Sequence, residues 1–200
     1  QNSWGDNFGE NGFFYISYYD TNIGTHNVVY TDIENTDNYD HIYQSDLCGW
    51  VGQLGYNKDS IYGANVFTAE GNETLKAASF YATGKDSQYE LYVVRQFEDE
   101  TSLEKMIPVA SGKLGNAGYY TVDFNQGIEV DAGERYAVVL YIITPGSVHP
   151  MAIEYAADEA TENVDLDDGE SYISANGSKW VSVDTVEKSN LCIKAFSDNR

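Results

Sequence analysis

Short stretches in which apolar and polar residues alternate fill this chain from residue 61 to residue 198. They are rich in Val, Ile, Tyr and Phe, which suit a pleated and half-buried surface, and they lack the period of a helix. The pattern predicts strands at Tyr62–Thr68, Leu75–Ala82, Tyr89–Phe97, Ile107–Ser111, Tyr119–Phe124, Ile128–Val130, Tyr136–Thr144, Met151–Tyr155, Ser171–Ser174, Lys179–Ser182 and Leu191–Phe196.

Turn-forming residues separate these stretches. They are Gly115-Asn116, Asn125-Gln126-Gly127, Asp131-Ala132-Gly133 and Asn176-Gly177. Many short strands at this spacing predict an all-β fold, an antiparallel jelly-roll-like β-sandwich, which we favour over a closed barrel. The stretch Tyr136–Ile143 is apolar on both faces, which indicates a central strand. Only Glu98–Lys105 has a short helical tendency, and we expect a loop there.

Composition divides the chain into three zones. Residues 1–25 are rich in Gly and aromatic residues and include an expected strand at Phe13–Tyr19. Residues 26–60 are acidic and then Gly-rich, so we expect an irregular connection. Residues 61–198 hold the expected sandwich.

The charge of the chain limits its partners. The net charge is −21, from 32 acidic and 11 basic residues. Phosphate backbones and anionic membrane surfaces would repel such a chain, so we expect no nucleic-acid partner. No apolar run approaches the roughly 18 residues of a membrane-spanning helix, and we expect no membrane span. The acidity suits solubility outside the cell, and it also suits binding of Ca²⁺.

Two acidic groups are candidate Ca²⁺ ligands. The first places four carboxylates within six residues, beside Gly169 for a turn, and consists of Asp165, Asp167, Asp168 and Glu170. It lacks the helical flanks and the full spacing of an EF-hand. The second group consists of Asp37, Asp40 and Asp46. Because runs of carboxylates usually form a solvated face, solvation is the alternative for both groups.

The cysteines and histidines do not indicate a disulfide framework or a catalytic site. Cys48 and Cys192 are too few for a disulfide framework, and the sequence leaves open whether they pair. His26, His41 and His149 lie in polar segments, where we expect them to be solvated.

The N-terminal residues contain a specific motif. They read Gln1-Asn2-Ser3-Trp4-Gly5, followed by Phe8-Gly9-Glu10-Asn11-Gly12-Phe13-Phe14-Tyr15-Ile16. This segment resembles the Asn-containing segment of papain-like cysteine peptidases, with Phe8 where the family has Trp and Phe13 where it has Tyr. The resemblance implies that Asn2 orients the catalytic imidazole and that Trp4 shields their hydrogen bond.

The same resemblance places the nucleophilic Cys and the His upstream of Asn2. Cys48 lies downstream of Asn2, and Gly-rich sequence follows it where a helix would be needed to activate a thiolate. We therefore expect no peptidase activity from this chain. We also expect it to be a piece of a longer protein, whose export signal lies upstream.

The remaining chain carries a second, more diffuse resemblance. Its elements are Asn38-Tyr39-Asp40, Ala64-Asn65-Val66-Phe67-Thr68-Ala69, Gly133-Glu134-Arg135-Tyr136-Ala137-Val138, Gly169-Glu170-Ser171-Tyr172-Ile173-Ser174 and Cys192-Ile193-Lys194-Ala195-Phe196. In this order they resemble the lectin-like domain that follows the papain-like domain in cell-surface peptidases of Gram-positive anaerobes. The resemblance implies a sandwich fold, an extracellular location at the cell surface, bound calcium, a glycan-binding role and an upstream peptidase domain as partner.

Sugars stack on exposed aromatic rings while polar groups bind their hydroxyls. Candidate platforms are Trp180, Tyr119, Tyr120 and Trp50, and Trp180 is the first choice because it follows the Asn176-Gly177 turn. Core packing is the alternative for each of them. Two functions therefore remain open: a module that binds cell-wall glycan or a surface protein, and a structural domain that supports the peptidase. An unpaired edge at Phe13–Tyr19 would favour dimerisation.

Overall fold

The computed structural model describes residues 5–25, 27–31, 33–167, 169–183 and 187–200. The chain divides into two compact units, Gln1–Thr36 and Asp37–Arg200. The predicted boundaries at residues 25 and 60 stay predictions. In the described part of the chain, no helix is long and apolar enough to cross a membrane.

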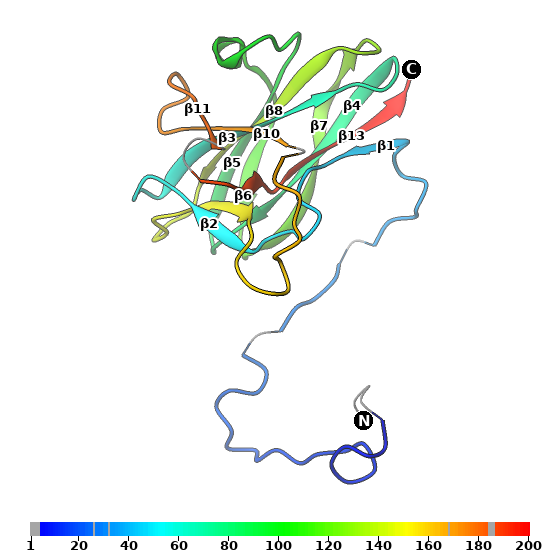
Figure 1. Ribbon diagram of the computed structural model, residues 1–200, viewed down its shortest axis with the longest axis vertical. Helices are drawn as coiled ribbons and strands as arrows, with labels where there is room; N and C mark the ends of the chain where they lie inside the picture. The colour runs from blue at the N-terminus through cyan, green and yellow to red at the C-terminus, as the bar shows by residue number, and fades with distance from the viewer. Residues whose placement is uncertain (1–4, 26, 32, 168, 184–186) are drawn as a thin grey trace. The chain divides into compact units, whose positions relative to one another are not determined.

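The larger unit consists of antiparallel strands, as predicted (Figure 1). They are β1 (His41–Tyr43), β2 (Gly52–Leu54), β3 (Ser60–Thr68), β4 (Glu73–Ala82), β5 (Ser87–Val94), β6 (Ile107–Leu114), β7 (Gly118–Val130), β8 (Arg135–Ile143), β9 (Met151–Glu154), β10 (Glu170–Ser174), β11 (Val181–Ser182), β12 (Asn190–Leu191) and β13 (Ile193–Asn199). The first two strands lie within the acidic, Gly-rich zone.

These strands form a sandwich. One sheet has the strand order β1-β13-β4-β7, a second has the order β11-β10-β3-β8-β5-β6, and a small third sheet has the order β12-β9-β2 (Figure 1). Strand β8 is central, as its sequence predicted, and pairs with β3 and β5. Because successive side chains alternate between faces, Val138, Leu140 and Ile142 enter the main core while Val139 and Tyr141 point to the outer face.

Two local predictions were wrong. The expected turn at Asn125-Gln126-Gly127 lies inside β7, where the pairing register with β4 shifts between Leu75 and Ala77. A bulge accommodates the extra residues without ending the strand. The expected loop at Glu98–Lys105 contains a 3₁₀ helix, η1 (Glu100–Glu104), because Asp99 and Ser102 form a capping box at its start.

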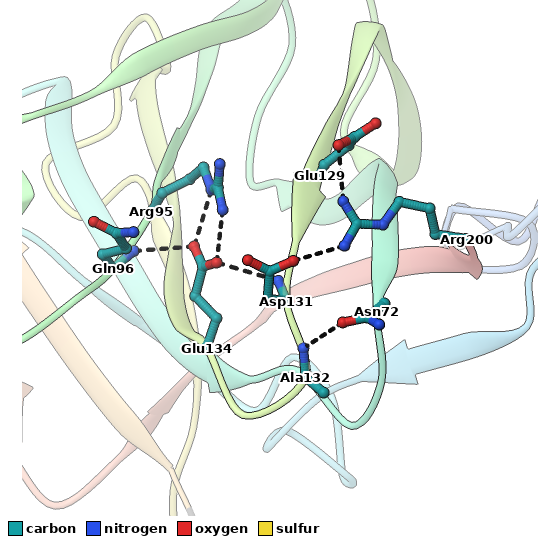
Figure 2. A network of polar contacts seen from close by, with 8 residues as sticks. All are labelled: Asn72, Arg95, Gln96, Glu129, Asp131, Ala132, Glu134 and Arg200. Carbon is teal, nitrogen blue, oxygen red and sulfur yellow. Dashed lines mark hydrogen bonds and ion pairs between the residues drawn. The ribbon is translucent and has the colours of Figure 1, made fainter.

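The turn at Asp131-Ala132-Gly133 forms as predicted and joins β7 to β8 (Figure 2). Behind it, the carboxylate of Glu134 accepts hydrogen bonds from Nε of Arg95 at 2.9 Å and from its Nη2 at 2.7 Å. The same carboxylate accepts from the backbone N–H of Asp131 at 3.1 Å. Figure 2 also shows Arg200 bridging Glu129 and Asp131, which fixes the end of β13 to β7.

The smaller unit contains no strand among its described residues. The expected strand at Phe13–Tyr19 is replaced by a single bridge between Glu10 and Phe13. A strand needs a hydrogen-bonded neighbour, and the described part of the unit offers none over this length. The predicted roles of Asn2 and Trp4 lie outside the described residues.

Candidate functional site

Five aromatic side chains gather on the outer face of the six-stranded sheet, and we call this set the aromatic face. Its members are Tyr62, Tyr92, Tyr141, Tyr172 and Trp180. Alternation along β3, β5, β8 and β10 brings the four tyrosines to one side of the sheet. All five side chains are partly buried, so each keeps some surface in contact with solvent.

Strand pairing sets the geometry of this face. Tyr62 of β3 lies opposite Tyr141 of β8, and their rings stack with centroids 4.2 Å apart and planes 21° apart. Trp180 meets Tyr62 edge to face at 6.2 Å. The turn before Trp180 contains Gly177 at φ +77°, where a Cβ would lie 3.2 Å from the Tyr62 ring. Glycine therefore lets the β10–β11 turn approach the tyrosine.

Two carboxylates hold phenol groups at the sides of the aromatic face. Tyr92 donates a hydrogen bond to Glu90, and Tyr172 donates to Glu170 at 2.8 Å. Burial, followed by these hydrogen bonds to carboxylates, raises the pKa of both phenols well above the ordinary value. Both phenols therefore stay protonated and keep their rings in place at physiological pH.

Two hollows flank the aromatic face beside β5 and β6. The first, which we call the Tyr141 hollow, has a volume of about 390 Å³ and is lined by Gln88, Tyr89, Glu90, Ser111, Gly112, Lys113, Tyr141 and Ile143. The second has a volume of about 310 Å³ and shares Glu90 and Ser111 with the first. Tyr62 covers the β3 side of Tyr141, and the hollow lies on its β5 side.

The Tyr141 hollow combines groups that suit a sugar. One aromatic ring can stack on the apolar face of a pyranose, while the amide of Gln88, the carboxylate of Glu90 and the ammonium of Lys113 can bind hydroxyls. Lectin-type sites need this combination of one flat apolar surface and a few polar groups.

The structure separates the predicted sugar platforms. Trp180 lies on the aromatic face, whereas Trp50 and Tyr119 lie over the outer face of the four-stranded sheet. There Tyr81 bridges them, with ring centroids 5.7 Å from Trp50 and 4.9 Å from Tyr119. Tyr120 follows Tyr119 along β7 and points to the opposite side, where it pairs with the buried Phe80.

The candidate calcium ligands do not gather in the described part of the chain, which contains no group of three or more metal-ligating side chains. Glu170 binds Arg135, and Asp165 accepts the backbone N–H of Asp167 at 3.0 Å. Asp168 lies outside the described residues. In the rival group Asp46 is buried, whereas Asp37 and Asp40 are exposed. Calcium binding stays a prediction.

The cysteines are unpaired: Cys48 is exposed and Cys192 is buried. His41 lies on β1, in contrast to its predicted position in a polar loop, and its ring nitrogen is 3.0 Å from Oδ1 of Asn199. His149 lies between strands as expected, and His26 lies outside the described residues.

Sequence reasoning overlooked Tyr62, Tyr141 and Glu90. A usable signal was present, since Tyr141 is the one polar-tipped aromatic residue on the outward-facing positions of a strand that is apolar on both faces. Its pairing with Tyr62 depends on the β3–β8 register, which joins residues far apart in the sequence and is not encoded locally.

Comparison with known proteins supports the lectin-like resemblance. A family model described as "Lectin like domain" matches residues 42–197. Among solved structures, the clostridial cysteine protease Cwp84 after propeptide cleavage is similar with a TM-score of 0.78 and 25% identity, over 100% of this chain and 50% of that chain. No curated protein sequence matches the chain.

A second solved structure contains the cysteine protease and lectin-like domains of Cwp84, a surface-layer-associated protein of Clostridium difficile. It is similar with a TM-score of 0.62 and 21% identity, over 80% of this chain and 36% of that chain, and this likeness supports the fold. The chain thus spans half or less of the length of these two structures.

Proposed function

This chain belongs to the lectin-like domain family, and from that premise we propose that it is a non-catalytic, carbohydrate-binding accessory domain of a secreted cell-surface cysteine peptidase. Its ligand in this proposal is a glycan of the cell wall. The upstream peptidase domain of the same protein is its covalently linked partner. The N-terminal Asn-Ser-Trp-Gly motif supports that arrangement, as does the similarity to a surface-layer-associated protein that contains both domains.

The observation that carries the proposal is the Tyr141 hollow beside the aromatic face. Stacked against Tyr62, the Tyr141 ring is held in one orientation before any ligand arrives. Preorganisation of this kind lowers the entropic cost of binding. Glu90 is also fixed through Tyr92, so a polar group stands at a defined place beside the ring.

The acidic charge of the chain fits a neutral or basic glycan better than an anionic one. A net charge of −21 repels polyanions at low ionic strength. We therefore propose neutral or amino-sugar-containing wall polysaccharide as the ligand class, with Glu90 facing the hydroxyl or ammonium groups of the sugar.

Cosedimentation with intact Gram-positive cell walls tests this proposal. The wild-type chain should pellet saturably, and Tyr141→Ala should reduce the affinity at least about tenfold, which corresponds to about 1.4 kcal/mol. The matched control is Tyr119→Ala, which removes an exposed tyrosine from the opposite sheet and should pellet like the wild type. If the wild type does not pellet, the alternative of a purely structural domain is favoured.

A further inference from the structure

Lys194 and Asp46 form a buried pair on the far side of the sandwich from the aromatic face. Lys194 belongs to β13, and Asp46 follows β1, the strand that pairs with β13. Nζ of Lys194 is 3.5 Å from Oδ2 of Asp46, with the two side chains 16% and 0% exposed. Neither carboxylate oxygen of Asp46 has a hydrogen-bond partner among the described residues. A buried carboxylate without hydrogen bonds lowers the stability of the folded protein.

Two other Lys–Asp pairs on this chain provide a comparison. Lys76 is 3.6 Å from Asp198, and Lys113 is 3.5 Å from Asp86, so their distances match that of the buried pair. All four of these side chains are well exposed to solvent, at 37% to 65%. Burial of a carboxyl group favours its neutral acid, and Asp46 is the one fully buried carboxyl among these three pairs.

A second buried carboxylate acts on Asp46 through its charge. Glu154 of β9 is fully buried, and it accepts hydrogen bonds from the backbone N–H of Cys48 and from Nδ2 of Asn190 at 3.1 Å. Burial raises the pKa of Asp46 to about 6, an effect that Lys194 opposes and the negative charge of Glu154 reinforces. Asp46 thus spends far more time as the neutral acid than an ordinary Asp does.

Aromatic side chains cover part of the pair. Nζ of Lys194 lies 5.9 Å from the centroid of the Tyr119 ring, and Tyr81 packs between Tyr119 and Trp50. The hydroxyl of Tyr119 is held by Oγ of Ser79 at 2.5 Å, which fixes this cover over the pair. Nζ of Lys194 also donates a hydrogen bond to Oε1 of Gln44 at 2.7 Å, so the amine is held in place beside the carboxyl group of Asp46, which suits condensation.

We propose that Lys194 and Asp46 join in an intramolecular isopeptide bond. Nζ of Lys194 attacks Cγ of protonated Asp46, so the Nζ–Cγ bond forms and the Cγ–OH bond breaks. The departing hydroxyl takes one proton from the attacking nitrogen and leaves as water. The reaction has no net redox change and requires no external reactant.

The bond would connect the start of the sandwich to its end. The residues between positions 46 and 194 would become a closed loop, which lowers the entropy of the unfolded chain. The amide would also replace two buried charges that are costly to desolvate. The consequence is a domain that resists thermal unfolding and proteolysis outside the cell.

The intact mass of the purified full chain under denaturing conditions tests the proposal. The wild type should be lighter than its sequence by one water molecule, and a tryptic digest should contain a branched peptide that joins the segments around Asp46 and Lys194. Lys194→Arg, which keeps the positive charge and the packing, should have the full mass.

Lys76→Arg is the matched control, because it changes an exposed Lys–Asp pair at nearly the same distance, and it should keep the missing water. Circular dichroism of each variant establishes that it is folded. A folded wild type with the full mass would overturn the proposal. A missing water that persists in Lys194→Arg would also overturn it, since the loss would then arise elsewhere in the chain.

Discussion

Tyr62 and Tyr141 stack across neighbouring strands of the six-stranded sheet, with ring centroids 4.2 Å apart. Each ring covers one face of the other, so the surface that Tyr141 offers to a ligand is on the side of the adjoining hollow. Tyr62 therefore acts as the support of the site and Tyr141 as its contact surface. Mutations can therefore distinguish the supporting role of Tyr62 from the ligand-contacting role of Tyr141.

Replacement of Tyr141 by Phe should preserve most of the affinity for wall glycan, because the ring and its stacking remain. Replacement by Leu should weaken binding at least about tenfold, since a branched aliphatic side chain offers no flat surface. Titration calorimetry with solubilised wall polysaccharide measures both variants. Equal affinities of the Phe and Leu variants would show that ring stacking has no part in binding.

Acid should destabilise the domain through Glu73, a buried residue of β4. Burial alone would raise its pKa, but hydrogen bonds from Ser197 at 2.5 Å and Tyr43 at 2.7 Å, with the backbone N–H of Gly71, lower it below the ordinary 4.5. A folded-state pKa below the unfolded one contributes stability above pH 4.5, which is lost as pH falls through the folded value.

Glu73→Gln should therefore lower the free energy of unfolding at pH 7 by about 1–3 kcal/mol, because charged hydrogen bonds are lost. The difference from the wild type should shrink as the pH falls below 4.5. Urea unfolding at a series of pH values measures this dependence. A constant difference between the two proteins down to pH 3 would refute the assignment to Glu73.

Breaking the polar contacts of the turn shown in Figure 2 should lower the stability of the domain and leave its glycan binding unchanged. Glu134→Gln removes the charge that holds Arg95, and its side chain is only 8% exposed. We expect a decrease of about 1–3 kcal/mol in the free energy of unfolding. Lys76→Ala, which removes an exposed ion pair outside the Tyr141 hollow, should leave the unfolding temperature nearly unchanged and serves as the control.

Local pattern predicted most of the fold and little of the site. The alternation along Tyr136–Ile143 was enough to identify a central strand, because strand periodicity is a local property. Tyr119 and Tyr120 are neighbours in sequence, but β7 sends them to opposite sides. The turn before Trp180 singled this residue out as a sugar platform, and that role stays a prediction. Its neighbour Tyr62 is more than 100 residues away in the sequence.

Long-range strand pairing also explains two further differences between the sequence-based predictions and the structure. The contact between Lys194 and Asp46 depends on β1 pairing with β13, and no spacing in the sequence indicates it. The residues Phe13–Tyr19 have the local pattern of a strand. A strand also needs a hydrogen-bonded neighbour, and local pattern does not show whether one is present.

Binding of the purified chain to wall polysaccharide, compared between Tyr141→Ala and Trp50→Ala, is the most direct test of the central claim. Each variant removes one partly exposed aromatic side chain, and the two residues lie over opposite sheets of the sandwich. If the Tyr141 hollow binds glycan, Tyr141→Ala should weaken binding at least about tenfold, and Trp50→Ala should bind like the wild type. Loss of binding in Trp50→Ala with normal binding in Tyr141→Ala would contradict the account.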